Sequence, residues 1–454
     1  MSWPDVLSLM LGGLTIGALR ATNTADYPTY VGVAIVALAF GTWPAESLKE
    51  KDTWFRVIMR VGLLLGSAII LFSPFAPSDR LGGTAIDGWT GSKTELWAYL
   101  MAHGIFLFPI VTYLFVEMRR WGLRWSVAAW NRLGAWGWLI AVPVVAVALV
   151  MLYFALSGVT VILIAAPIMA AALLLMPRLR LPGATRFWLL MVVLALALSL
   201  AVELVVFRGD ISRMNMVFKF YYQIWTLLGI AGAVALGRLW GRLPVEAPRW
   251  SGAWRTIMVI LVMAGLLYPP FAARGKLAER FYQGAPPGLD GMAYMADSLY
   301  TEVDNAGNVH ELSLRWDYEA INWMQDNVVG TPVVVEGRSR HEYLWGGRVS
   351  INTGLPTLVG WGNHQRQQRG VVVPHNLLDR RIQDTQLLYS DPSIVTAQKI
   401  LDRYGVKYIV VGELEKMYYP QDGLSKLDRM VQDGALRIVY QNPGVRVYEV
   451  ISDQ

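Results

Sequence analysis

The sequence predicts a polytopic α-helical membrane bundle of about nine spans, followed by a C-terminal extracytoplasmic α/β domain. Two observations predict this fold class. Nine apolar stretches fill residues 1–272 of the 454-residue chain, and residues 273–454 then have the composition of a water-soluble domain. Apolar runs of roughly 20 residues match the thickness of a hydrocarbon core. Charged residues make up 16% of the chain, below the roughly 25% that is typical of soluble domains.

The predicted spans are separated by short polar or basic connections. The first two spans are short, which suits tilted or re-entrant helices. We place the spans at residues 5–20, 29–43, 55–75, 96–117, 134–155, 157–176, 186–206, 217–239 and 254–272.

Three connections, those after spans four, six and eight, concentrate the arginines. They lie on one side of the bundle, which the positive-inside rule assigns to the cytoplasm. Because the bundle ends on an odd span, the C-terminal domain is expected on the extracytoplasmic side of the cell membrane. The arginines are Arg119, Arg120, Arg124 and Arg132 in the first connection, Arg178, Arg180 and Arg186 in the second, and Arg238, Arg242 and Arg249 in the third.

Composition narrows the class of function. Much of the net charge of +6 lies in those connections, so nucleic acid is not an expected partner. The absence of cysteine excludes disulfides, thiolate metal sites and cysteine nucleophiles. The sequence contains neither a P-loop nor a Gly-x-Ser-x-Gly elbow. Its histidines lack close metal-ligand spacing, so we predict no metal site from them.

Polar segments at residues 22–28, 76–95 and 203–215 fall on the same predicted outer face as the soluble domain. This shared side favours a site between the bundle and that domain. Within the third segment and the span that follows, ionisable groups lie near membrane depth, where they are costly and mark function by default. Glu203 is notable because it sits in an apolar run with no adjacent cation. The other candidates here are Asp210, Arg213, Asn215, Lys219, Tyr221 and Tyr222.

A structural interpretation of the same segment stays open. If it is helical, Asp210 and Arg213 are an ordinary interfacial pair three residues apart, Lys219 snorkels, and the two tyrosines join an aromatic belt. Asp26 in the first outer connection has two interpretations as well. Its carboxylate suits a general base or a metal ligand, but it is also a good N-cap for the second span.

The soluble region reads as α/β. Helical patterns at residues 316–327, 394–403 and 424–433 alternate with strand patterns at 333–335, 407–411, 436–440 and 445–450, and the last two strands form an antiparallel pair. Between the first strand and the second helix we predict a long functional loop, rich in Trp, Gly and Arg, at the carboxyl end of a strand. Its candidate sugar or acceptor ligands are Trp361, His364, Arg366 and Arg369. The alternative is a polar loop packed on the membrane face.

Four motifs resemble the YYY family of polytopic membrane proteins. They are residues 19–29 (LRATNTADYPT), 213–225 (RMNMVFKFYYQIW), 348–357 (RVSINTGLPT) and 361–370 (WGNHQRQQRG). The resemblance covers essentially the whole chain. That family in turn is similar in architecture to the GT-C integral-membrane glycosyltransferases. Members typically begin with further spans and an Asn-Tyr-Tyr-Tyr-type motif, which this sequence lacks, so the chain is expected to be the C-terminal part of a member.

The resemblance implies a GT-C-like glycosyltransferase, or its C-terminal portion, that moves a sugar from a polyprenyl-phosphate donor to an extracytoplasmic acceptor. The alternative is a non-catalytic membrane protein, either a transporter of a lipid-linked substrate or an assembly scaffold. A divalent cation is left open as a cofactor. The expected domains are a bundle (1–272), a connection (273–315) and an α/β domain (316–454). The expected roles are catalysis for Asp26, Glu203 and Asp210, lipid-phosphate binding for Arg213, Lys219, Tyr221 and Tyr222, and sugar or acceptor binding for Asn23, Asn215, Trp361, His364, Arg366 and Arg369.

Overall fold

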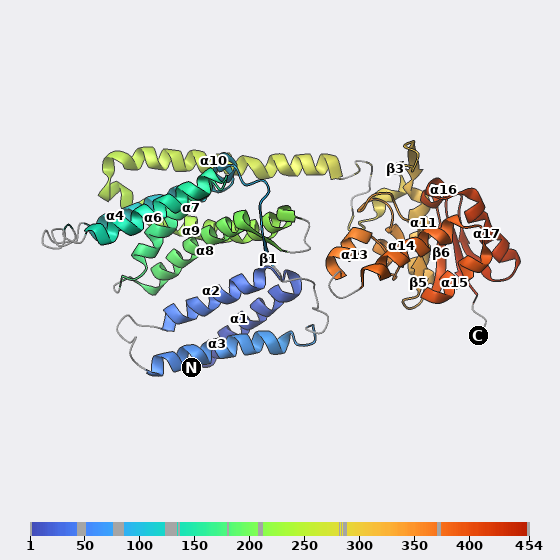
Figure 1. The fold of residues 1–454 in the computed structure, drawn as a ribbon, viewed down its shortest axis with the longest axis horizontal. Coiled ribbons are helices and arrows are strands. Elements are labelled where there is room, and N and C mark those ends of the chain that lie inside the picture. Colours follow the sequence, from blue (N-terminus) through green and yellow to red (C-terminus); the bar gives the residue numbers. More distant parts are fainter. Residues whose placement is uncertain are drawn as a thin grey trace. The chain divides into compact units, whose positions relative to one another are not determined.

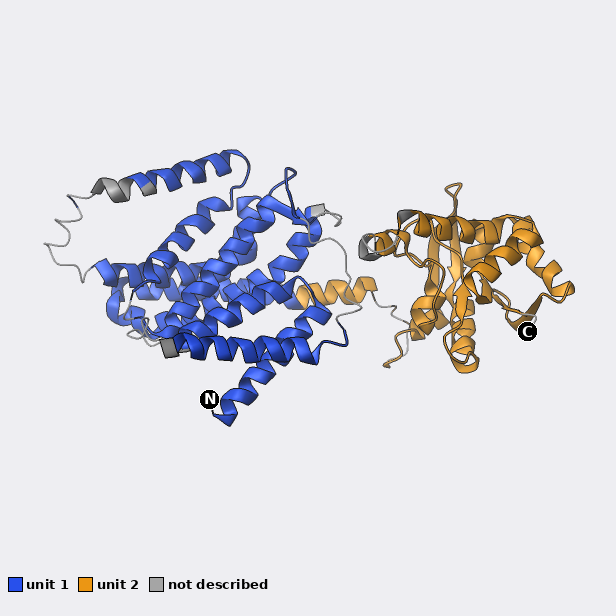
Figure 2. Cartoon of the chain, turned by 60° about the horizontal axis from the view of Figure 1, so that its bottom comes forward, with its two compact units in different colours: residues 1–269 blue, residues 270–454 orange. Residues whose placement is uncertain are grey.

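The computed structural model describes residues 2–42, 51–75, 86–122, 134, 137–178, 181–207, 212–280, 282, 284, 288–369 and 374–451. The chain forms two compact units, Met1–Pro269 and Pro270–Gln454 (Figure 2). The first is helical and the second is α/β, so the predicted fold class is confirmed.

In the described part of unit 1, a helix coincides with each predicted span (Figure 1). Six of these helices are long and apolar enough to cross a membrane, and three apolar stretches, Asp26–Gly41, Val144–Leu156 and Ile162–Leu175, are shorter. The helices are α1 (Trp3–Thr22), α2 (Asp26–Thr42), α3 (Lys51–Leu71), α4 (Leu96–Gly122), α6 (Gly137–Leu156), α7 (Ile162–Leu175), α8 (Gly183–Leu204), α9 (Ser212–Glu246) and α10 (Pro248–Arg280).

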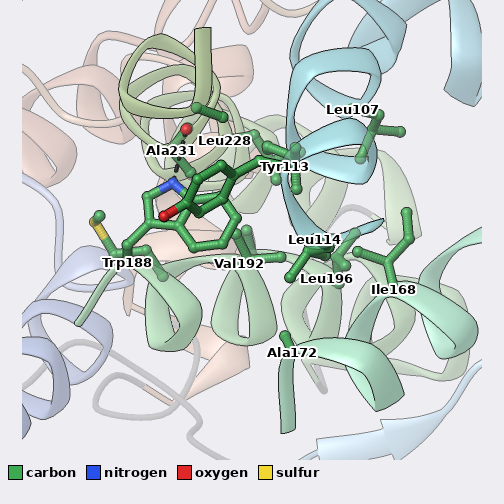
Figure 3. Close-up of a cluster of buried hydrophobic side chains, with 14 of the residues drawn as sticks. Leu107, Tyr113, Leu114, Ile168, Ala172, Trp188, Val192, Leu196, Leu228 and Ala231 are labelled. Carbon is green, nitrogen blue, oxygen red and sulfur yellow. Dashed lines mark hydrogen bonds between the residues drawn. The ribbon is translucent and has the colours of Figure 1, made fainter. Parts of the chain in front are cut away.

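The core of unit 1 lies where α4, α7, α8 and α9 pack on one another, while α1, α2 and α3 form a smaller group. Trp188 of α8 anchors the main core. Its indole N–H donates to the Ala231 carbonyl of α9 at 2.8 Å, and the Tyr113 ring of α4 meets it edge-on at 4.9 Å (Figure 3). Outward-facing side chains of α10 such as Leu266 and Phe271 are exposed. An apolar outer surface of this kind is solvated by lipid.

A short two-stranded ribbon joins the connection before α4 to the end of α8. Strand β1 (Ile86–Gly88) pairs antiparallel with β2 (Val205–Phe207), with Ile86 opposite Phe207. Helix α8 ends here because Val205 turns extended, and the residues that follow, Val206 and Phe207, favour strand over helix.

Unit 2 is built on a mixed sheet with the strand order β5-β6-β8-β7. The first pair is parallel and the other two are antiparallel. Side chains alternate between two cores, as strand geometry requires: Val335 and Ile409 face one layer of helices, whereas Val334 and Val410 face the other. The strands are β5 (Val333–Val335), β6 (Val406–Val411), β7 (Leu436–Gln441) and β8 (Arg446–Val450).

The predicted elements of this unit are confirmed within a few residues, including the antiparallel pair β7–β8. Part of the segment expected as a connection is ordered: it contains a 3-10 turn, η2 (Ala293–Ala296), and a hairpin of β3 (Leu299–Val303) and β4 (Val309–Ser313). The prediction of one long loop after β5 is wrong, because three helices, α12, α13 and α14, interrupt it. The helices of unit 2 are α11 (Leu314–Asn327), α12 (Arg348–Thr353), α13 (Gly362–Arg369), α14 (His375–Ser390), α15 (Ile394–Tyr404), α16 (Glu413–Tyr418) and α17 (Gln421–Gln432).

Candidate functional site

The β1–β2 ribbon creates a polar cluster at one end of the helical unit. Because β1 is paired with β2, the residues just after β1 lie against the last turn of α8, where the Trp89 amide donates to the Leu204 carbonyl at 2.8 Å. Thr94 is thereby brought to Glu203, although they are 109 residues apart in sequence. We call Lys93, Thr94, Glu203, Arg213 and Tyr221 the Glu203 cluster.

Glu203 is the centre of this cluster and has 0% of its surface exposed. Its Oε2 accepts the Thr94 amide N–H at 2.9 Å, and its Oε1 accepts from Nη2 of Arg213. Arg213 also donates to the Thr94 hydroxyl at 2.6 Å and, through Nε, to the Val202 carbonyl at 3.0 Å. The sequence suggested that Glu203 has no cation beside it. The fold supplies one from the first turn of α9.

Lys93 and Tyr221 complete the cluster. The Lys93 ammonium donates to the backbone carbonyls of Trp89 and Glu203, both at 2.7 Å, and the Tyr221 hydroxyl lies 3.4 Å from the Thr94 hydroxyl. Within the described residues of the cluster, two cationic side chains thus meet one carboxylate. The balance is positive, which favours an anionic ligand in a site partly withdrawn from water.

A buried polar column continues from Tyr221 into the bundle. The His103 ring lies 5.3 Å from the Tyr221 ring and 4.5 Å from the Tyr99 ring, and Tyr99 donates to Ser199 Oγ at 3.0 Å. The Nδ1 atom of His103 lies 3.1 Å from the Tyr99 carbonyl oxygen. Lys93, Thr94 and Tyr99 are not among the candidates that the sequence offers, because only the tertiary fold brings these residues to Glu203.

Asp26, at the start of α2, lies beside a part of α9 that is distant from the Glu203 cluster. Gln223 of α9 donates to the carbonyl of Ala25 at 3.2 Å, which places the start of α2 beside that helix. Gln223 follows Arg213 by ten residues, or about 15 Å along a helix axis. Asp26 is the first residue within α2, and its Oδ1 is buried without a hydrogen-bond partner among the described residues. Asn23 caps the end of α1 through its backbone N–H, which donates to the Leu19 carbonyl.

The other candidates of the bundle divide between the cluster and its surroundings. Tyr221 belongs to the cluster, whereas Tyr222 is 65% exposed and its ring meets that of Phe218 at 5.3 Å. Asn215 and Lys219 are half-buried on α9 and have partners of their own. Asp210 lies outside the described residues.

Unit 2 contains a second buried ion cluster at the carboxyl ends of β5 and β6. Arg348, which is 1% exposed, donates from Nη1 and Nη2 to the two carboxylate oxygens of Glu415 at 3.1 and 2.9 Å. Its Nε lies 2.7 Å from Asp317 Oδ2, and its Nη1 lies 3.9 Å from Glu336 Oε2. We call Asp317, Glu336, Arg348 and Glu415 the Arg348 cluster.

Three carboxylates around one guanidinium cannot all be neutralised by it. Burial raises the pKa of Glu336 to about 7, because desolvation outweighs the charge of Arg348 and the amide hydrogen bonds from Ser350 and Val349. Desolvation acts on Glu415 as well, but the charge and hydrogen bonds of Arg348 outweigh it, so the pKa of Glu415 is lowered. Glu415 therefore holds Arg348, and Glu336 accepts a proton near neutral pH.

Two glycines allow the loops to approach this cluster. A Cβ at Gly337 would lie 2.7 Å from Glu415 Oε1, and one at Gly412 would lie 2.7 Å from Arg348 Nη2. The amides of both glycines donate to Glu415 instead, at 2.7 and 2.6 Å. The cluster thus ties the loops after β5 and β6 together and is a scaffold for the surface above it.

That surface carries an aromatic group formed by Tyr343, Trp361 and His364. The Tyr343 ring lies 4.8 Å from Trp361 and 6.0 Å from His364, and its hydroxyl is 3.3 Å from His364 Nδ1. Tyr343 has a left-handed backbone (φ 62°) and is 55% exposed. Strained non-glycine residues of this kind concentrate at functional sites. Arg366 pairs with Asp379 on the surface. Arg369 ends α13.

A metal centre finds no support in the described ranges, which contain no group of three His, Asp or Glu side chains arranged to hold an ion. Those residues therefore offer no ligand set for the divalent cation that the sequence left open as a cofactor.

Comparison with known proteins identifies one family. The model of the family described as "Uncharacterized membrane protein (DUF2298)" matches residues 2–228, which include the whole Glu203 cluster and Asp26. No curated protein shows significant similarity to the chain. Among solved structures, the crystal structure of the C-terminal globular domain of an oligosaccharyltransferase from Archaeoglobus fulgidus is similar at 15% sequence identity. The match covers 30% of this chain and 95% of that chain with a TM-score of 0.20, a value too low for any argument about fold or function.

Proposed function

The chain belongs to this family of uncharacterized membrane proteins, and from that premise we propose that it is a GT-C-like membrane glycosyltransferase, or the C-terminal portion of one. It transfers a sugar from a polyprenyl-phosphate donor to an acceptor on the extracytoplasmic side of the cell membrane, where unit 2 also lies. The observation that carries the proposal is the positive balance of the Glu203 cluster, within the family-matched residues, at an end of the bundle.

Lys93 and Arg213 have the chemistry to bind the donor phosphate. As the sugar leaves, negative charge grows on that phosphate, and fixed cations stabilise it without reorganisation. Glu203 acts by holding Arg213 in place, because both of its oxygens already accept hydrogen bonds. In the same proposal Lys219, Tyr221 and Tyr222 flank the lipid phosphate.

Asp26 is the better candidate for the catalytic carboxylate. Because its neighbour Gln223 lies about 15 Å along α9 from Arg213, the proposal requires the start of α2 to move toward the Glu203 cluster when the donor binds. A base must have a free oxygen to accept the proton of the acceptor hydroxyl, and Asp26 Oδ1 is buried with no partner among the described residues. Asn23 and Asn215 offer polar side chains for the sugar. In unit 2, the aromatic group that includes Trp361 and His364, with Arg366 and Arg369, suits an acceptor, because sugar rings stack on aromatic faces.

The first experiment tests phosphate recognition. The full chain in detergent is titrated with geranylgeranyl phosphate, and geranylgeraniol, which has the same chain without the phosphate, is the matched ligand. We expect saturable binding of the phosphate ester and at least about tenfold weaker binding of the alcohol, since charge-assisted hydrogen bonds contribute about 1.5–3 kcal/mol.

Two variants separate the effect of the net charge of the Glu203 cluster from that of a direct contact between Arg213 and the phosphate. Lys93→Met removes the excess positive charge. The double variant Glu203→Gln with Arg213→Gln leaves the net charge unchanged but removes the guanidinium. Loss of phosphate binding in both variants supports the proposal, and wild-type binding in both overturns it.

Catalysis is tested with polyprenyl-phosphate mannose and polyprenyl-phosphate glucose as donors, by release of polyprenyl phosphate. Asp26→Asn is expected to reduce turnover by about 100-fold or more with donor binding retained. Asp5→Asn, which removes an exposed carboxylate at the start of α1, is the matched control. Turnover that survives in Asp26→Asn contradicts the assignment of the base.

A further inference from the structure

A second site lies in the helical unit among α4, α8, α9 and the connection that precedes α8. A narrow cavity there, with room for about one water molecule, is lined by apolar side chains of the main core and by Tyr113, Glu117, Arg178 and Thr185. The Trp188 and Tyr113 rings that form its floor belong to the packed core of Figure 3. A rigid floor of this kind holds the polar groups above it in fixed positions.

Arginines converge on this pocket in excess over carboxylates. Glu117 alone is approached by three guanidinium groups: Arg242 at 3.3 Å, Arg120 at 3.4 Å and Arg178 at 3.9 Å. Arg120 also pairs with Glu246 at the end of α9. One carboxylate cannot satisfy three arginines, so the charge here remains positive.

Arg238 adds a cation that is held by neutral groups. It donates to the Tyr113 hydroxyl at 2.6 Å and to Thr185 Oγ1 at 3.2 Å, and its guanidinium lies over the Tyr113 ring at 5.4 Å. Arg186 donates to the Arg178 carbonyl at 3.0 Å, which brings one more guanidinium to this end. Five arginines therefore share Glu117 and Glu246 among the described residues of this region.

Arg178 has donor capacity left over. Its side chain is 16% exposed and its guanidinium lies 5.9 Å from the Trp121 ring. Its Nη1 is buried without a hydrogen-bond partner among the described residues, because Glu117 Oε2, at 3.9 Å, is too far away for a hydrogen bond. A buried charged N–H group without an acceptor is costly, and an anionic ligand is the natural acceptor.

We propose that the arginine pocket at the mouth of this cavity, formed by Tyr113, Glu117, Arg178, Thr185, Arg238 and Arg242, binds a phosphate group through its partly exposed guanidinium groups. The phosphate belongs either to an anionic lipid head group or to a soluble phosphate compound, and both would be recognised by the same guanidinium groups. The site shares no residue with the Glu203 cluster and does not depend on the glycosyltransferase proposal. Arginine fits phosphate well because its planar fork donates two parallel hydrogen bonds.

The test uses the full chain in nanodiscs and follows its thermal unfolding. In one arm, phosphatidylcholine nanodiscs are titrated with inorganic pyrophosphate, with sodium chloride at equal ionic strength as the control. In the other, phosphatidylglycerol replaces phosphatidylcholine in steps. We expect a saturable rise of the unfolding temperature in at least one arm, and the arm that responds identifies the source of the phosphate.

Matched variants decide whether the pocket is responsible. Arg178→Gln and Arg242→Gln each remove one charge from the pocket. Arg119→Gln removes one charge from an exposed position of α4, on the same turn as Glu117. The pocket variants are expected to need about tenfold more anion for the same rise, while Arg119→Gln behaves as wild type. Each rise in unfolding temperature is measured against the same variant without anion. Because Arg242 is partly exposed, Arg242→Gln is the pocket variant expected to fold normally. The proposal is overturned by no rise in wild type, or by an equal loss in Arg119→Gln.

Discussion

The Glu203 cluster of the helical unit and the Arg348 cluster of the globular unit both bury charge, but in opposite proportions. The first places two cations, Lys93 and Arg213, around one carboxylate. The second places three carboxylates around one arginine. The cluster with surplus positive charge lies at the end of a bundle and attracts anions. The cluster with surplus carboxylate is sealed inside a domain, where it accepts a proton and ties loops together.

We propose that this difference separates a group that recognises a ligand, the Glu203 cluster, from one that specifies a fold, the Arg348 cluster. A buried ion pair adds little net stability compared with an apolar replacement, but removing one partner is strongly destabilising. Removing one partner is therefore expected to destabilise either cluster, whereas removing both partners of the Glu203–Arg213 pair is expected to restore most of the stability.

The largest effect is expected for Arg348→Met. It leaves Asp317 and Glu415 buried without their cation, and the opening free energy of unit 2 should fall by about 3–5 kcal/mol. The measurement is amide hydrogen exchange of β6 in the full chain, which reports local opening. Arg437→Met, which breaks a surface pair with Glu449 on the same sheet, is the control and should cost less than about 1 kcal/mol. Equal effects of the two substitutions would mean that the Arg348 cluster is not the scaffold of this domain.

Arg213→Met is expected to destabilise the helical unit by about 3 kcal/mol, because it leaves the buried Glu203 without its guanidinium partner. Adding Glu203→Met should recover most of that loss, since both charges are then gone. The readout is the thermal unfolding of the full chain in detergent. If the double variant is as unstable as the single variant, the pair stabilises the fold and the comparison with the Arg348 cluster fails. Recovery of stability without recovery of phosphate binding supports the ligand role.

The third prediction concerns pH. The pKa of Glu336 is raised from 4.5 to about 7 in the folded domain, so the folded state holds a proton that the unfolded state releases. Its contribution to stability is complete below about pH 4.5 and is lost as the pH rises through about 7. Between pH 4.5 and about pH 6 the loss is about 2 kcal/mol, from about 1.4 kcal/mol per pKa unit.

Glu336→Gln isolates this contribution. The measurement is the opening free energy of β6 as a function of pH, from hydrogen exchange corrected for intrinsic rates. Whatever its baseline stability, the variant should lose the part of this pH dependence that belongs to Glu336. An unchanged slope would show that Glu336 is ionised in the folded domain, and the Arg348 cluster would then carry more negative charge than we assign to it.

The sequence predicts elements well where a pattern is local. The strand at residues 333–335 and the hairpin at the end of unit 2 follow from runs of β-branched residues and an Asn-Pro-Gly turn. Helices α12, α13, α14 and α16 were not predicted, and for α12 the reason is a tertiary contact: Glu336, itself buried, accepts its first amides. Six residues carry too little periodicity to be read as a helix.

The site follows the same rule. Glu203, Arg213 and Tyr221 were identified because ionisable and polar residues near membrane depth stand out in an apolar sequence. Their partner Thr94 carried no signal, since a threonine in a polar connection is ordinary. The sequence also carried no sign of the pairing of Glu203 with Arg213, because the packing of α9 against α8, and not sequence spacing, brings the two together. The role of Asp26 stays a prediction.

The smallest effect is expected for Tyr343, on the surface above the Arg348 cluster. Its left-handed backbone (φ 62°) costs about 1–2 kcal/mol for a residue with a Cβ, and Tyr343→Gly removes that cost. The same substitution removes the ring contact with Trp361, which contributes about 0.5–1.5 kcal/mol. The two changes nearly cancel, so β6 hydrogen exchange should shift by less than about 1 kcal/mol. Tyr343→Phe keeps the ring and the strain and loses only the hydroxyl contact to His364, so it should match wild type. A loss above about 2 kcal/mol in Tyr343→Gly would make the ring part of the core, and the strain would then be a by-product of packing instead of a feature of a binding surface.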